Sequence, residues 1–303
     1  MLFDSSPICI NFLEDDLFIR KKVSVSILRL DKIHPVVSGN KLFKLHFFLK
    51  EALSAGHKTI TSFGGAYSNH LVATAYACRL SGLNSVGIVR GDRPPILSHT
   101  LQECSRFGMQ LKFITRKDYG LIKNGCANTL LQNEFSESTI IPEGGYHPLG
   151  AKGAALIMGL FNKEKFSHIC TATGTATTLA GLLLAAGKGQ SIVGIPVLKG
   201  ITDMPERIRY LAGITPNPDQ LHLLHQYHFG GYAKRTTELL QFMNRCWKQF
   251  QLPLDFVYTA KMFYGVMESI KNDHYPAGSN ILCLHTGGIQ GNGSLPEGSL
   301  LYP

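Results

Sequence analysis

Short apolar runs alternate with longer stretches of helical periodicity along most of this sequence. Such alternation is typical of parallel β-sheets whose strands are joined by crossover helices. The expected strands are Val23–Leu28, Lys58–Phe63, Ser85–Val89, Gln110–Ile114, Thr139–Ile141, His168–Thr171, Ser191–Val197, Leu221–Leu224, Phe256–Tyr258 and Ile281–Leu284. The expected helices are Lys41–Ser54, Asn69–Leu80, Ser98–Phe107, Gly150–Phe161, Thr178–Ala186, Thr236–Phe250 and Lys261–Asn272. The sequence therefore predicts an α/β fold with open, mostly parallel sheets and flanking helices.

The length of 303 residues suits two domains or one large α/β unit. A boundary is expected near Glu143-Gly144-Gly145, where glycines break the pattern between two αβ series. The seven cysteines are scattered and form no Cys-x-x-Cys pair, which argues against a disulfide framework and a zinc site. His222, His225 and His228 recur every three residues without an obvious carboxylate or cysteine partner, so we expect no metal ion.

Charge and hydropathy exclude several classes of function. The formal net charge is +9, yet the sequence has no basic tail, zinc finger or RNP motif, so we expect no nucleic-acid partner. No apolar run approaches the length of a membrane span, so we expect no membrane association. Residues 1–16 lack the basic and apolar segments of a signal peptide. We therefore expect a cytoplasmic protein.

Lys41 is the most informative single residue. It lies where the helical periodicity of residues 42–53 begins, directly after Asn40, a residue type that favours the N-cap position. In the first helical turn, the positive end of the helix dipole disfavours an ammonium group. A lysine in such a place can lose its proton and act as a nucleophile, the state that an imine-forming lysine needs. The alternative is an ordinary exposed lysine near a helix start.

Ligands of open α/β sheets bind beyond the carboxyl ends of the strands, where this sequence has glycine-rich or polar segments. In residues 63–70 the glycines permit close backbone approach, and Ser68 and Asn69 offer polar side chains; a capped helix start is the alternative. In residues 172–178 small residues precede a helix, so free N–H groups and threonine hydroxyls predict a cradle for a single phosphate. A plain small-residue turn is the alternative there. Walker and GxGxxG patterns are absent, so a dinucleotide is not expected.

Two further segments follow later strands. Tyr258, in residues 257–262, is a candidate proton-transfer group, although a buried structural tyrosine is the commoner case. Thr286, in the glycine-rich residues 285–293, could place a hydroxyl against a ring nitrogen; the alternative is a terminal loop. A candidate lysine, a single-phosphate cradle and a polar loop after a strand are the parts of a pyridoxal-phosphate site.

The motifs that carry a family resemblance are Ser38-Gly39-Asn40-Lys41, Gly64-Gly65-Ala66-Tyr67-Ser68-Asn69-His70, Pro142-Glu143-Gly144-Gly145, Gly174-Thr175 with Ala180-Gly181, and His285-Thr286-Gly287-Gly288. Together they resemble the 1-aminocyclopropane-1-carboxylate (ACC) deaminase and D-cysteine desulfhydrase family. The resemblance implies the tryptophan synthase β-subunit-like fold of pyridoxal-phosphate enzymes and a homodimer. It implies a large cofactor-binding domain of residues 1–45 and 150–303 and a small domain of residues 46–149.

The resemblance also implies site residues. Lys41 matches the Schiff-base lysine, Asn69 the residue that bonds the 3′ oxygen of the cofactor, and Thr286 the hydroxyl at the pyridine nitrogen. Tyr232 and Tyr258 match active-site tyrosines. The phosphate loop, which has Ala176 and Thr177 where glycines are common, comprises Gly174, Thr175, Ala176, Thr177 and Thr178. The expected catalytic residues are thus Lys41, Ser68, Tyr232 and Tyr258, and the expected substrate-binding residues are Ser68, Asn69, His70 and Tyr258.

Departures from the family pattern bear on the substrate. The resemblance implies a Tyr-Glu pair in ACC deaminases of the type form where this chain has Tyr258-Thr259, and a leucine where it has Thr286. In addition, Phe43 replaces the arginine that is usual in the family. A carboxylate near the ring nitrogen would keep that nitrogen protonated, whereas a hydroxyl suits easier chemistry. We therefore expect α,β-elimination from a small amino acid, best exemplified by D-cysteine, giving pyruvate, sulfide and ammonia. The alternatives are ACC deamination in the same site and a cofactor- or phosphate-binding protein without turnover.

Overall fold

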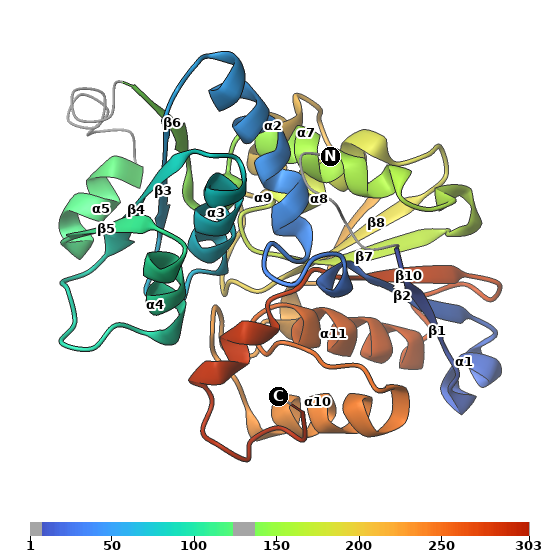
Figure 1. Ribbon diagram of the computed structural model, residues 1–303. Coiled ribbons are helices and arrows are strands. Elements are labelled where there is room, and N and C mark those ends of the chain that lie inside the picture. The colour runs from blue at the N-terminus through green and yellow to red at the C-terminus, as the bar shows by residue number, and fades with distance from the viewer. Residues whose placement is uncertain (1–7, 124–136, 303) are drawn as a thin grey trace.

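Two β-sheets form the frame of the computed structural model, which describes residues 8–123 and 137–302 (Figure 1). The large sheet has the order β1-β2-β10-β7-β8-β9, and its strands are β1 (Ile10–Leu13), β2 (Ser24–Arg29), β7 (His168–Thr173), β8 (Ser191–Pro196), β9 (Leu221–Leu223) and β10 (Asn280–His285). The small sheet has the order β5-β4-β3-β6, and its strands are β3 (Thr59–Gly64), β4 (Asn84–Arg90), β5 (Met109–Ile114) and β6 (Ser138–Ile141).

Neighbouring strands are parallel in both sheets, except that the edge strand β1 is antiparallel to β2. Each parallel pair needs a crossover, and the helices that follow the strands supply it. The expectation of an α/β fold with two open, mostly parallel sheets and flanking helices is confirmed. No helix among residues 8–123 and 137–302 is long and apolar enough to cross a membrane.

Helices cover both faces of the large sheet, so its inner strands β2, β7, β8 and β10 are buried on both sides. One face carries α7 (Pro148–Ala155), α8 (Thr177–Ala185) and α9 (Met204–Ala212). The other face carries α1 (Asp16–Lys21), α10 (Thr237–Phe250) and α11 (Thr259–Lys271). The helices of the small sheet are α3 (Asn69–Leu80), α4 (His99–Arg106) and α5 (Arg116–Lys123).

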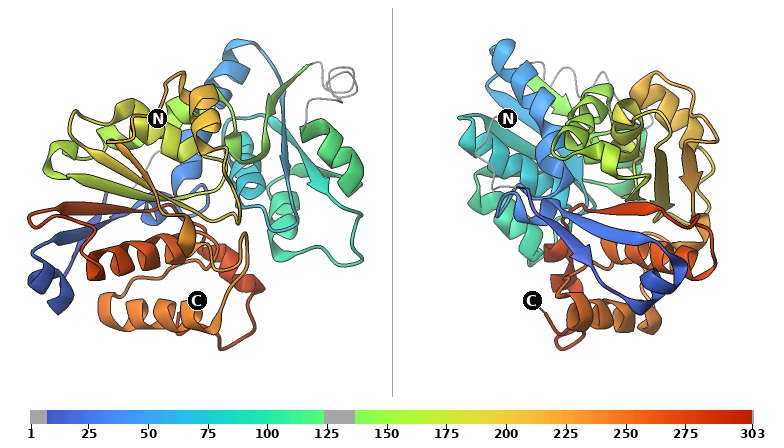
Figure 2. Two further views of the ribbon diagram at one scale, coloured as in Figure 1. Left: turned by 180° about the vertical axis from the view of Figure 1, so that it is seen from behind. Right: turned by 90° about the vertical axis from the view of Figure 1, so that its right-hand side faces the viewer.

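Helix α2 (Asn40–Ser54) lies between the two sheets, as the front and rear views agree (Figures 1 and 2). Its apolar side chains at positions 42, 45 and 49 are buried in one cluster that also holds Ile60 of β3 and Leu282 of β10. Helix α2 therefore packs against both sheets, and its first turn lies at the carboxyl end of β10. The division into domains of residues 1–45 with 150–303 and residues 46–149 stays a prediction.

Two local predictions are wrong. Asn40 is not the N-cap of α2: Gly39 is, with φ +68°, and Asn40 is the first helical residue. A β-carbon on Gly39 would lie 1.9 Å from the carbonyl oxygen of Thr286, so only glycine permits this contact between α2 and the end of β10. Residues 256–258 form a turn rather than a strand, because the carboxylate of Asp255 captures the backbone N–H groups of residues 257–259.

Among the α-helices and strands of residues 8–123 and 137–302, β1, α1, α5 and α9 have no counterpart in the sequence-based expectation. The expected helix over residues 150–161 is instead α7, which starts at Pro148 and is followed by a 3₁₀ segment, Leu156–Gly159. The other expected helices and strands are present with small shifts at their ends, as is usual for boundaries inferred from sequence. Cys126 lies outside the described residues, and the remaining six cysteines are unpaired.

Candidate active site

The predicted residues of the large sheet gather around the first turn of α2. The side chain of Asn40 donates a hydrogen bond to the Thr178 hydroxyl (2.8 Å), and its backbone N–H donates to the Thr286 carbonyl oxygen (3.3 Å). On the other side, a β-carbon at Gly174 would lie 3.3 Å from the ring of Tyr258. Lys41 therefore lies beside the loop that joins β7 to α8, near the ends of β10 and the start of α11.

The small sheet contributes the start of α3 to the same place. Ser68 caps α3 by accepting the N–H of Leu71 (3.3 Å), so the capped helix start considered for this segment exists. Asn69 approaches the glycine-rich segment after β10, where a β-carbon at Gly291 would lie 3.9 Å from its amide nitrogen. His70 is only 4% exposed and lies near Gly145, where a β-carbon would be 3.8 Å from its ring. The first turn of α3 thus faces the large sheet across the site.

The start of α8 has the properties of an anion cradle. Its N-cap residue is Ala176, which adopts a left-handed conformation with φ +69° and makes no side-chain capping bond. The first N–H groups of a helix without such a cap have no partner within the helix, and the helix dipole favours an anion there. The hydroxyls of Thr175 and Thr177 are 2.9 Å apart at the same end. The positive φ also explains why glycines are common at this loop position in the resembling family.

Two lysines occupy successive turns of α2 beside this cradle. Burial lowers the pKa of Lys41 to about 8, although the charge of Asp255 opposes the shift. Burial lowers the pKa of Lys44 well below its usual value, and the charge of Lys41 adds to that effect. The Lys41 ammonium nitrogen lies 2.6 Å from the side-chain oxygen of Asn40, and that of Lys44 lies 3.2 Å from the carbonyl oxygen of Gly144. The surroundings of both amines therefore favour the neutral form of each. A bound anion nearby would instead stabilise the charged form.

Unpaired polar atoms mark the same region. Both ring nitrogens of His70 and the side-chain oxygen of Asn69 are buried without a hydrogen-bond partner in the described part of the chain. Burial, with the charges of Lys41 and Lys44, lowers the pKa of His70 to about 3, and the nearby Pro142 carbonyl opposes this only weakly. Because unsatisfied buried polar atoms are rare in native proteins, this group is suited to a ligand that supplies partners.

Replacing Lys44 with methionine should stabilise the protein without cofactor. A buried amine with a lowered pKa costs stability below that pKa, and the cost disappears as pH rises toward the unfolded-state value of 10.5. We expect a gain of about 2 kcal/mol in the free energy of unfolding at pH 7, which vanishes above pH 10.5. Urea unfolding of both proteins without cofactor, at pH 7 and pH 10.5, measures this. A destabilised variant at pH 7 would contradict the burial argument, and Lys50→Met on the exposed side of α2 is the control.

Two tyrosines line the side of the site opposite α2. The rings of Tyr232 and Tyr258 meet edge to face, with centroids 6.0 Å apart. Burial raises the pKa of Tyr258 well above its usual value, with further contributions from the charge of Tyr232 and a hydrogen bond to it. Burial also raises the pKa of Tyr232. Both hydroxyls therefore keep their protons at neutral pH, which suits proton donors.

Asp255 is a buried carboxylate that the sequence analysis missed. Its Oδ2 accepts the N–H groups of Val257 (3.0 Å) and Tyr258 (2.8 Å), and its Oδ1 accepts the N–H (2.9 Å) and hydroxyl (2.7 Å) of Thr259. These four bonds fix the turn that leads into α11 and hence the position of Tyr258. An aspartate before a helix is an N-cap signal, but the apolar residues 256–258 suggested a strand instead.

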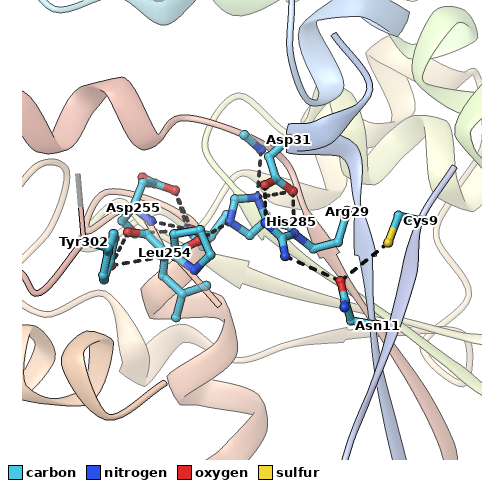
Figure 3. Close-up of polar contacts among 11 residues, drawn as sticks. Cys9, Asn11, Arg29, Asp31, Leu254, Asp255, His285 and Tyr302 are labelled. Atoms are coloured by element: carbon cyan, nitrogen blue, oxygen red, sulfur yellow. Dashed lines mark hydrogen bonds and ion pairs between the residues drawn. The ribbon is translucent and has the colours of Figure 1, made fainter. Parts of the chain in front are cut away.

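A buried polar network surrounds His285, the last residue of β10 (Figure 3). Arg29 donates two hydrogen bonds to Asp31, from Nε to Oδ1 (2.9 Å) and from Nη2 to Oδ2 (2.6 Å). His285 places Nδ1 3.2 Å from Asp31 Oδ1 and donates from Nε2 to the Pro253 carbonyl oxygen (2.6 Å). Burial raises the pKa of Asp31, but the hydrogen bond from Arg29 and the charges of His285 and Arg29 together hold it below its usual value. The network joins the ends of β2 and β10 to the segment that carries Asp255.

A family model described as pyridoxal-phosphate dependent enzyme matches residues 19–287 of this sequence. The chain belongs to the family of pyridoxal-phosphate dependent enzymes. It is 30% identical to a putative ACC deaminase of Pyrococcus abyssi, over 89% of this chain and 86% of that protein. It is also 30% identical to the bifunctional D-cysteine desulfhydrase/ACC deaminase, mitochondrial, of Arabidopsis thaliana, over 84% of this chain and 70% of that protein.

A solved structure points the same way for this pyridoxal-phosphate enzyme. The crystal structure of an ACC deaminase homologue superposes with a TM-score of 0.79 at 28% identity, covering 95% of this chain and 91% of that one. The resemblance inferred from the motifs is therefore confirmed, and so is the tryptophan synthase β-subunit-like class of fold. The residues present also suit the cofactor, because the uncapped start of α8, the amine of Lys41 and the side-chain N–H group of Asn69 can meet a phosphate, an aldehyde and a ring oxygen.

Proposed function

We propose that this enzyme catalyses α,β-elimination from a small amino acid, with D-cysteine giving pyruvate, sulfide and ammonia. The observation that carries the proposal is the pairing of a lysine whose pKa is lowered with two tyrosines whose pKa values are raised, in one site. Elimination needs a base for the α-proton and an acid for the leaving group. The lowered pKa of Lys41 makes its neutral amine more accessible, and the two tyrosine hydroxyls carry protons at neutral pH. The similarity to a protein named for both activities supports the choice of substrates to test.

The residues of this chain divide the work as follows. Lys41 would bind the cofactor, and its amine would later hold the proton removed from the substrate's α-carbon. Ser68, Asn69 and His70, at the start of α3, would bind the substrate and the cofactor's ring oxygen. The segment Gly174–Thr178 would hold the phosphate, and Thr286 would face the ring nitrogen. Bound there, pyridoxal phosphate supplies the electron sink that makes the α-proton acidic.

The two tyrosines would act at the far end of the substrate. Tyr258 is the more buried, and Tyr232 is 50% exposed, so together they extend from the interior of the site to its mouth. A protonated hydroxyl beside the leaving sulfur can donate a proton to it as the carbon–sulfur bond breaks. The aminoacrylate released from the site adds water and loses ammonia to give pyruvate. We propose further that the protein acts in the cytoplasm as a homodimer.

ACC deamination is the second candidate. The same lysine and tyrosines would serve it, and two of the similar proteins carry that activity in their names. Against it, this chain has Thr259 and Thr286 where glutamate and leucine are expected in an ACC deaminase. The Thr259 hydroxyl also donates a hydrogen bond to Asp255, which fixes its orientation.

The test is product release by purified, pyridoxal-phosphate-loaded protein. We expect pyruvate and sulfide from D-cysteine, and little or no 2-oxobutanoate from ACC. L-cysteine is the matched control, because it differs only in handedness. Turnover of ACC at a higher kcat/KM than D-cysteine would overturn the elimination proposal in favour of the second candidate. A protein that binds the cofactor but converts none of the three would contradict both.

A further inference from the structure

Lys261 is a buried cation in a place that disfavours one. It is 0% exposed and lies in the first turn of α11, where the helix dipole opposes a positive charge. Burial lowers the pKa of Lys261 to about 8, and the charge of Asp255 opposes the shift. Its ammonium nitrogen donates to the carbonyl oxygen of Gly231 over 2.7 Å. Helix packing alone does not require an amine here, so its single bond to a neighbouring turn needs an explanation.

That neighbouring turn carries Tyr232. Its backbone is tightly wound, because Gly231 has φ +117° and Phe229 and Ala233, which are not glycines, have φ +50° and +53°. Left-handed conformations are unfavourable for such residues, so contacts from outside the turn must maintain them. The Gly231 carbonyl oxygen accepts one bond within the turn, from the N–H of Lys234 (3.1 Å), and one from outside it, from Lys261.

The two tyrosines are thus held by one short segment of α11 and its cap. Asp255 fixes Tyr258 through its backbone N–H, and Lys261, three residues later, fixes the turn that carries Tyr232. The rings meet at a centroid distance of 6.0 Å. Elsewhere in the described residues, α11 packs against residues 227–229, with Gly265 against Tyr227 and Tyr264 against Phe229.

We propose that Lys261 is a positioning residue, which holds the turn around Gly231 so that the hydroxyl of Tyr232 faces that of Tyr258. The inference rests on the proposed function, in which both hydroxyls serve the leaving group. The hydrogen bond of Lys261 goes to Gly231, outside the segment Gly174–Thr178, so its loss should leave cofactor binding intact. It should weaken only the step that needs both tyrosines.

Lys261→Met tests this, because methionine keeps the volume and removes the donor. We expect the affinity for pyridoxal phosphate to stay within about 3-fold of wild type. Amide hydrogen exchange at residues 229–234 should become about 10-fold faster or more, because the turn loses its outside bond. With D-cysteine, kcat should fall about 10-fold or more, with little change in KM. Lys271→Met, at the exposed end of the same helix, is the matched control and should alter none of these.

Two comparisons separate positioning from general destabilisation. Tyr232→Phe should lower kcat by a similar factor, and adding Lys261→Met to it should cause little further loss, because both changes remove the same contribution. If the two losses in kcat multiply in the double variant, or if the exchange rate at residues 229–234 is unchanged in Lys261→Met, the proposal is overturned. The exchange measurement needs no substrate, so it still decides if every amino acid tested is inert and the proposed function fails. Should Lys261→Met not fold, Lys261→Leu, which also removes the donor, gives the same exchange readout.

Discussion

Lys41→Ala should abolish turnover and leave the protein without the yellow colour of a lysine-bound pyridoxal cofactor. Removal of a residue that binds the cofactor covalently and handles the substrate proton is expected to cost about 1,000-fold or more in kcat. The structure gives the reason for choosing Lys41 among the three lysines with lowered pKa values. Lys44 bonds the Gly144 carbonyl oxygen and Lys261 the Gly231 carbonyl oxygen, whereas Lys41 lies at the uncapped start of α2 beside the anion cradle.

Reduction with borohydride followed by peptide mapping measures this directly. We expect the trapped cofactor on Lys41 in the wild-type protein and no trapped cofactor in Lys41→Ala. Lys50→Ala, on the exposed face of the same helix, should keep both the colour and the activity. Label recovered on Lys44 or Lys261 instead would show that the assignment of the lysine is wrong.

Asp31→Asn should destabilise the fold by about 3 kcal/mol at pH 6, because it leaves Arg29 buried without its carboxylate. The side chains of Arg29 and Asp31 are 5% and 6% exposed, so water cannot replace the lost partner. The folded-state pKa of Asp31 lies below its ordinary value of 3.8. The stabilisation is therefore complete above that ordinary value and is lost as pH falls through the folded-state pKa.

Urea unfolding of wild type and variant at pH 6 and at pH 3 checks both parts of this prediction. The difference between the two proteins should be largest at pH 6 and smaller at pH 3. Asp203→Asn is a suitable control, because Asp203 is 53% exposed in its pair with Arg207 and exposed pairs contribute little. Equal unfolding midpoints for wild type and Asp31→Asn at pH 6 would contradict the view that the network in Figure 3 supports the end of β10.

Much of the fold follows from local patterns in the sequence. The strands of both sheets, apart from β1, have apolar runs with glycine-rich or polar ends, so their positions and parallel pairing could be predicted. Strand β1 is short and half-buried at the edge of the sheet, and α1 is a short helix beside it, so neither has a strong periodic signal. Helix α9 begins after Asp203 and has Pro205 near its start, a pattern that is typical of helix starts and could have predicted this helix.

The candidate site could be predicted where a residue type at a recognisable local position points to one kind of chemistry. Lys41 after a helix start and the small residues around Gly174 have that character. Asp255, Lys44 and Lys261 were missed because their importance depends on burial against distant segments, which no local pattern encodes. Asp255 also shows how one wrongly predicted element hides a residue: because residues 256–258 were predicted to be a strand, its role in fixing the turn before α11 could not be predicted.

The pairing of β2 with β10 has a consequence for how the protein is made. Ser24 pairs with Asn280 and His285 with Arg29, so two strands from nearly opposite ends of the chain lie side by side at the centre of the large sheet. Strands β3 to β6 of the small sheet are close in sequence and can pair while synthesis continues. The start of α2 and Thr286, by contrast, meet only when β10 inserts beside β2, because Asn40 donates its backbone N–H to the Thr286 carbonyl oxygen. We therefore expect the ribosome-bound chain to have no complete cofactor site until β10 emerges, and to expose the edge of β2 until then.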